Sequence, residues 1–80
     1  MLHIAKKTRL NREDIINRAS KYFGKYGEGL TETCRNFCGI SFEGIGGYVS
    51  TTVTDEKQFR MVDVETREFE YQAKRFLEKI

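Results

Sequence analysis

The chain contains no proline and no tryptophan, and it has only two cysteines and one histidine. Without proline or a low-complexity tract, nothing in the 80 residues marks a linker, and two cores of useful size would not fit. Two cysteines are too few for a disulfide-rich scaffold. Together with His3 they fall short of the four ligands of a structural zinc site, so we expect no metal and no cofactor.

Long apolar runs are also absent. No stretch approaches the roughly 18 consecutive apolar residues of a membrane span, and the first ten residues carry basic side chains where a signal peptide would be apolar. We therefore expect no membrane partner and a cytoplasmic location.

Catalytic chemistry has little support in the sequence. Its single histidine lies near the start, and no serine or cysteine has a base that spacing identifies. Cys34 and Cys38 are separated by three residues, which favours ordinary thiols. A hairpin between them leaves a disulfide as the alternative. We expect a protein that is not an enzyme.

The stretch 37–66 organises the chain. Cys38, Ile40 and Phe42 alternate before Gly44-Ile45-Gly46-Gly47, and the β-branched run 48–54 follows it. Alternation on both sides of a glycine cluster predicts a β-hairpin, because glycine takes the positive φ angles of a tight turn without strain. Further strands are predicted over 30–34 and 59–65, which makes three or four in an antiparallel meander.

The segments before and after these strands show the spacing of apolar residues that is typical of helices. Asn11 is a predicted N-cap for a helix whose apolar stripe runs from Ile15 to Phe23, and Gly24 is predicted to end it in the left-handed conformation. Thr66 is a predicted N-cap for a second helix with an apolar stripe from Phe69 to Ile80.

These elements predict an α+β fold, a two-layer sandwich of helix, meander and helix with both helices on one sheet face. Residues 1–10 are predicted to be a mostly flexible basic N-terminal segment, with a short edge strand docked through Leu2, Ile4 and Leu10 as the alternative. Residues 11–80 are predicted to be a single α+β domain.

The chain from about Arg9 onward, and particularly the segments 41–50 and 64–72, resembles a loose group of short uncharacterised prokaryotic α+β proteins. This resemblance implies the hairpin and the final helix but no activity. The element order is also similar to that of double-stranded RNA-binding domains. However, Arg67-Glu68-Phe69-Glu70-Tyr71 lacks the basic cluster with which such domains bind phosphate.

The face of the sheet away from the helices is predicted to be open. Our first hypothesis is a protein-interaction module that binds an unknown protein partner, or a second copy, through this face and the hairpin tip. The candidate partner-binding residues are Ile45, Tyr48, Ser50, Thr52 and Phe59.

The alternative is nucleic-acid binding by a basic N-terminal arm. Residues 1–26 hold seven basic and two acidic side chains, whereas the remainder holds seven basic and ten acidic ones. The candidates for phosphate contacts are Lys6, Lys7, Arg9 and Arg12. The overall charge of +2 is too small to imply a polyanionic partner, and a solvated basic segment remains the simpler interpretation.

Overall fold

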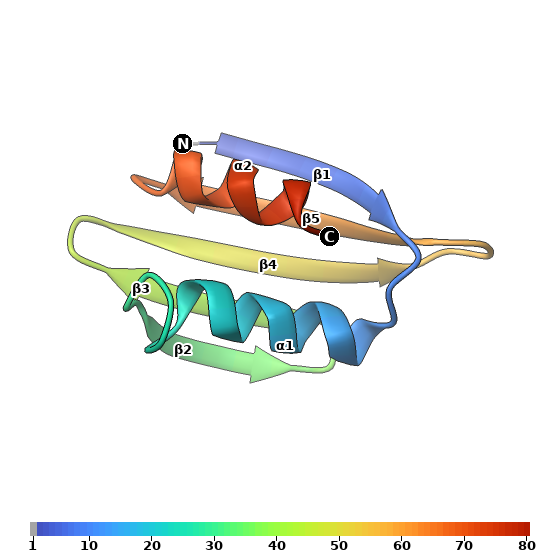
Figure 1. Cartoon of the computed structure of the whole chain (residues 1–80), viewed down its shortest axis with the longest axis horizontal. Coiled ribbons are helices and arrows are strands. Elements are labelled where there is room, and N and C mark those ends of the chain that lie inside the picture. The colour runs from blue at the N-terminus through green and yellow to red at the C-terminus, as the bar shows by residue number, and fades with distance from the viewer. Residues whose placement is uncertain (1) are drawn as a thin grey trace.

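The computed structural model describes residues 2–80 and has the predicted α+β class, with an antiparallel sheet and two helices (Figure 1). In chain order the elements are β1 (Leu2–Thr8), α1 (Arg12–Phe23), β2 (Thr31–Asn36), β3 (Gly39–Gly44), β4 (Gly47–Asp55), β5 (Arg60–Arg67) and α2 (Glu70–Glu78).

The sheet has five strands in the order β1-β5-β4-β3-β2, and every neighbouring pair is antiparallel. Strands β2 to β5 form a meander, and β1 is added beside β5. The prediction of a flexible N-terminal segment is therefore corrected for Leu2–Thr8, while Met1 lies outside the described residues, and the strand number is corrected as well. Strand β1 pairs with β5 from Leu2 opposite Thr66 to Thr8 opposite Arg60.

The N-terminal strand was hard to recognise because polar residues occupy half of its inward positions. Leu2 and Ile4 face the helices, but Lys6 and Thr8 continue the same face. Lys6 Nζ donates to the carbonyl oxygen of Leu77 at 2.6 Å, and Thr8 Oγ1 donates to that of Ile80 at 3.0 Å. Backbone acceptors at the end of α2 thus satisfy these two polar side chains.

Both helices lie over the same face of the sheet, where α1 contacts β3 and β4 and α2 contacts β1 and β5 (Figure 1). The helices meet through Phe23 and Phe76, whose ring centroids are 5.2 Å apart, and Phe23 also packs on Phe42 at 5.6 Å. The core comprises Ile15, Ala19, Phe23, Leu30, Ile40, Phe42, Val49, Val53, Val62, Val64, Ala73, Phe76 and Leu77.

The opposite face of the sheet carries the alternate residues of each strand. In β4, Val49, Thr51 and Val53 are buried, whereas Thr52 and Thr54 are exposed, as the alternation in the sequence predicts. No helix covers this open face in the described chain (Figure 1).

The first helix begins where the sequence predicts. Asn11 is the N-cap, and its side chain accepts a hydrogen bond from the backbone N–H of Asp14 at 2.8 Å. Gly24 is the C-cap, but its φ of −79° is not left-handed, which corrects the expected closure. The left-handed residue comes later, at Gly29 with a φ of 79°.

The second helix begins later than predicted. Thr66 is not its N-cap but a buried residue of β5, and its hydroxyl donates to the Tyr48 carbonyl oxygen at 2.7 Å. Phe69 occupies the N-cap position without a side-chain capping bond. Strand β5 continues through Arg67 because Arg67 pairs with Tyr48 of β4. Local capping rules do not take such pairing between strands into account.

The turn between β5 and α2 contains a strained residue. Glu68 has a φ of 75°, in the left-handed region that costs a residue with a Cβ roughly 1–2 kcal/mol. A Cβ built on Gly47 would lie 2.8 Å from the Cβ of Glu68, so the turn is also tightly packed.

We expect Glu68→Gly to raise the free energy of unfolding by about 0.5–1 kcal/mol, because relief of the strain exceeds the added entropy of the unfolded chain. Thermal unfolding followed by circular dichroism measures the change as an increase of roughly 3–6 °C in Tm. The control is Glu56→Gly, since Glu56 is exposed and is not among the positive-φ residues. An equal rise in both variants, or a loss in Glu68→Gly, would contradict the strain at this turn.

Candidate interaction surface

The predicted partner-binding residues do not all lie together. Tyr48, Ser50 and Thr52 occupy the open face of β4, and Ile45 is fully exposed at the tip of the adjoining β3–β4 hairpin. Phe59 lies in the β4–β5 hairpin, beyond the other end of this nine-residue strand. A strand of that length spans roughly 30 Å, so Phe59 is not part of a surface centred on Tyr48 and Ile45.

Strand register orders the open face into rows. One row crosses the whole sheet, and it consists of His3, Glu65, Ser50, Ser41 and Cys34. The next row consists of Ala5, Asp63, Thr52 and Gly39. The hydroxyl groups of Ser41 and Ser50 are 3.2 Å apart. Because its central side chains are small, the middle of this face is flat and polar.

Larger side chains border the flat centre at the end near the hairpin tip. Tyr48 lies opposite Arg67 on one side and Glu43 on the other. Its hydroxyl donates to Glu65 Oε2 at 2.8 Å, and this hydrogen bond is the main reason why the pKa of Tyr48 is raised. The bond joins Tyr48 to the neighbouring strand β5, and the ring provides aromatic surface beside the flat centre.

The charges on the open face are mixed. Glu43, Asp63 and Glu65 lie on one face, and His3 Nε2 is 3.4 Å from Asp63 Oδ1. Lys7 and Arg67 provide positive charge on the same face. A face of mixed charge lacks the uniformly positive field that a phosphate backbone attracts.

Both edges of the sheet carry features that oppose the addition of another strand. In β1, the inward Lys6 places a charge among the core positions of the edge. In β2, all six residues are exposed and the register shifts between Glu32 and Cys34. A shift of this kind and inward-pointing charges are common ways of protecting a sheet edge. The open face, not an edge, is therefore the more accessible surface of the sheet.

Two of the four predicted phosphate-binding cations take part in the fold. Lys6 binds the carbonyl oxygen of Leu77, and Arg12 binds three groups of the protein. The Nζ of Lys7 lies 4.8 Å from the centre of the Phe59 ring. Arg9 is exposed on the segment between β1 and α1. The four cations are thus dispersed and do not form one basic arm.

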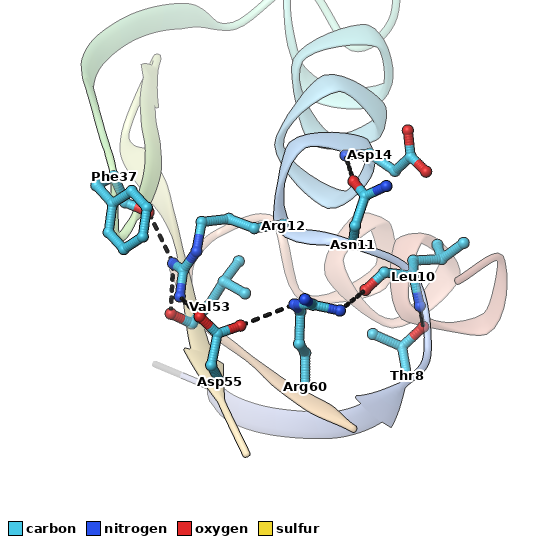
Figure 2. Close-up of polar contacts among 9 residues, drawn as sticks. All are labelled: Thr8, Leu10, Asn11, Arg12, Asp14, Phe37, Val53, Asp55 and Arg60. Carbon is cyan, nitrogen blue, oxygen red and sulfur yellow. Dashed lines mark hydrogen bonds and ion pairs between the residues drawn. The ribbon is translucent and has the colours of Figure 1, made fainter. Parts of the chain in front are cut away.

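Arg12, Asp55 and Arg60 form a polar group, the Arg12 cluster, that sequence reasoning did not identify (Figure 2). Arg12 Nη1 donates to the carbonyl oxygens of Phe37 at 2.7 Å and Val53 at 3.0 Å. Its Nη2 lies 2.6 Å from Asp55 Oδ2, and Arg60 Nε donates to Asp55 Oδ1 at 2.7 Å.

The contacts of Arg12 join three separate parts of the chain. Arg12 opens α1, Phe37 lies in the β2–β3 turn, and Asp55 ends β4. The guanidinium of Arg12 also lies 4.2 Å from the centre of the Phe37 ring, a cation–π distance. Its hydrogen bond to Asp55 is the main cause that lowers the pKa of that carboxyl group. These contacts indicate a structural role for Arg12.

Cys34 and Cys38 are both free and exposed. The β2–β3 hairpin pairs Asn36 with Gly39 and Cys34 with Ser41, so the two cysteines do not face each other across the strands. Asn36 Oδ1 instead accepts a hydrogen bond from the backbone N–H of Cys38 at 2.8 Å. Within residues 2–80 there is no group of three or more His, Cys, Asp or Glu side chains that could hold a metal ion.

Comparisons with known proteins do not extend these observations. No family model matches the chain, and neither the curated proteins nor the solved structures contain a match. In the described chain, neither helix has the length and apolar character needed to cross a membrane. What the fold and surface define is a small α+β domain with one open sheet face.

Proposed function

We propose that this chain is an interaction domain that binds a protein, either another protein or a second copy of itself, through the open face and the hairpin tip. The observation that carries the proposal is the uncovered sheet face, with both helices on the other side (Figure 1). An open face with a hydrogen-bonded tyrosine at its border and an exposed isoleucine beside it supports contact with another macromolecule.

The residues near the tip have the character of binding anchors. Tyr48 is half-buried with its hydroxyl bound to Glu65, so little rotational freedom is lost when a partner covers its ring. Ile45 extends from a turn in which Gly46 takes a φ of 80°, and a partner would remove its whole side chain from water.

The size of the face sets a limit on the complex. Five strands about 4.8 Å apart, each about 23 Å long, give a flat area of roughly 450 Å². A standard interface buries about 800 Å² on each partner. The proposed interface therefore includes the hairpin tip as well as the face, or it belongs to the smaller, transient class.

Site-specific photocrosslinking tests the proposal in cells that natively express the chain. We expect a benzophenone amino acid at Ser50 or Thr52 to give a discrete crosslinked product, because both positions lie on the proposed interface. The matched control is the same amino acid at Lys74, which is exposed on α2. Light scattering and mass spectrometry of the product distinguish a second copy from a different protein.

The same experiment includes a competing variant. Thr52→Arg places a large charged side chain in the flat centre of the face, and it should reduce crosslinking from Ser50 at least about fivefold without unfolding the domain, because position 52 is exposed. Equal crosslinking from positions 50, 52 and 74, or a persistent product in Thr52→Arg, would rule out the open face as the interface.

A further inference from the structure

A groove lies between the two helices, on the side of the molecule opposite the open face. Its volume is about 270 Å³, and it is lined by Arg18, Lys21, Tyr22, Phe76, Lys79 and Ile80. The first three of these residues belong to α1 and the others to α2 or to the residues that follow it. The proposed interaction surface shares no residue with this groove.

The floor of the groove is aromatic and apolar. The ring centroids of Tyr22 and Phe76 are 5.7 Å apart, and Ile80 packs against the same core. Phe76 is almost completely buried, so Tyr22 supplies the aromatic surface that an occupant would reach. Burial and the nearby carboxylate of Glu28 raise the pKa of Tyr22. The hydroxyl of a tyrosine is a hydrogen-bond donor at neutral pH.

The rim of the groove is positively charged. Arg18 and Lys21 are one helical turn apart, on the same side of α1. Lys79 approaches from the other helix, with its Nζ 5.3 Å from the centre of the Tyr22 ring. In the described part of the chain, Arg18, Lys21 and Lys79 form no ion pair.

The two carboxylates that raise the pKa of Tyr22 lie outside the groove. Glu28 and Glu78 are close enough to affect Tyr22, but neither lines the groove. Glu78 Oε2 lies 3.6 Å from Arg75 Nη1, and it is thus paired with a cation outside the groove. Arg18 Nη1 donates to the carbonyl oxygen of Lys79 at 3.4 Å. The rim therefore combines an aromatic floor with Lys21 and Lys79, which form no ion pair within residues 2–80.

We infer that this groove binds a small aromatic anion, such as an aromatic carboxylate or sulfonate. The ring of the ligand would lie on Tyr22 and Ile80, and its acid group would contact Lys21 and Lys79 at the rim. Ligand sites typically combine an apolar lining with a few placed polar groups, at volumes from about 300 Å³ upward. This groove lies near that lower limit, so the ligand is small.

Fluorescence titration with 8-anilinonaphthalene-1-sulfonate tests the inference, since this probe carries a sulfonate on an aromatic body. We expect saturable binding at one site, weakened about fivefold by Lys21→Gln or by Lys79→Gln, because each removes about 1 kcal/mol of charge attraction. The matched control is Lys74→Gln, a lysine of α2 outside the groove, which should leave the affinity within twofold.

Two further measurements identify the site and the role of charge. The neutral probe N-phenyl-1-naphthylamine should bind at least about tenfold more weakly than the sulfonate, and Lys21→Gln should not change its affinity. Amide chemical shifts of the folded protein should move around Tyr22 and Lys79 and stay constant around Ser50. Non-saturable binding, equal loss in Lys74→Gln, or shifts centred on the open face would overturn the inference.

Discussion

Phe76→Ala should lower the free energy of unfolding by roughly 3–5 kcal/mol, the largest effect that we expect from a single substitution. The ring is 1% exposed and lies within 5.2 Å of Phe23 and 5.7 Å of Tyr22, measured between centroids. Its removal would leave a cavity where the two helices meet. Because a domain of ordinary stability has about 5–15 kcal/mol, urea denaturation would show a much lower midpoint or no folded baseline.

Two variants separate this packing effect from a general effect of changing α2. Phe76→Leu retains much of the volume and should cost less than about 2 kcal/mol. Tyr71→Ala removes an aromatic ring from the same helix where it is 70% exposed, and it should change stability by no more than about 0.5 kcal/mol. If Phe76→Ala costs no more than Tyr71→Ala, α2 does not pack on the sheet as described.

Arg12→Met should lower the free energy of unfolding by about 2 kcal/mol, since it keeps the aliphatic part of the side chain and removes the guanidinium. The loss leaves the carbonyl oxygens of Phe37 and Val53 and the carboxylate of Asp55 without this donor. A hydrogen bond to a charged group contributes about 1.5–3 kcal/mol to stability. Partial exposure of Arg12 and Asp55 reduces the contribution of their three bonds, so we expect a total near 2 kcal/mol. Urea denaturation at neutral pH measures the difference, with Arg9→Met on the exposed linker as the control.

The pH dependence of the stability difference between wild type and Arg12→Met provides an independent check. Arg12 lowers the pKa of Asp55 in the folded protein. The stabilisation is therefore complete above the pKa of the unfolded chain, near 4, and is lost as the pH falls through the lower folded value. The gap in stability between wild type and Arg12→Met should narrow as the pH falls below about 4 but should not close, because the hydrogen bonds to the Phe37 and Val53 carbonyl oxygens do not titrate. A gap that stays constant with pH would show that the Asp55 carboxylate is not part of the contribution.

The two proposed sites can be tested independently because they lie on opposite sides of the molecule. The interaction surface includes Ser50 and Thr52 on the open face, whereas the groove lies between α1 and α2. Thr52→Arg should leave probe binding in the groove unchanged, and Lys79→Gln should leave crosslinking from Ser50 unchanged. Either proposal can fail without affecting the other.

Local patterns identified the elements whose residues carry a strong periodic signal. The Gly44–Gly47 reversal was predicted because alternating strands flank a glycine cluster, and Asn11 was predicted as a cap from its position before an apolar stripe. Thr66 shows the limit of such reasoning. Its hydroxyl is typical of an N-cap, but pairing with β4 keeps it in a strand.

Only part of the candidate interaction surface could be predicted from the sequence. Alternation within β4 placed Tyr48, Ser50 and Thr52 on the open face, because a side-chain period of two is a property of the strand itself. The position of Phe59 was not predictable in that manner. It depends on the length of β4, which separates the two hairpins and so places Phe59 far from Ile45.

By itself, the sequence determined the periodicities: two apolar helical stripes, the alternation of the central strands and the glycine turn between them. These follow from interactions between residues a few positions apart. Only the tertiary structure decided that Leu2–Thr8 joins the sheet, that Arg12 binds Asp55, and that Lys21 and Lys79 share a groove. Each of these depends on contacts between residues distant in the chain, for which a local pattern carries no signal.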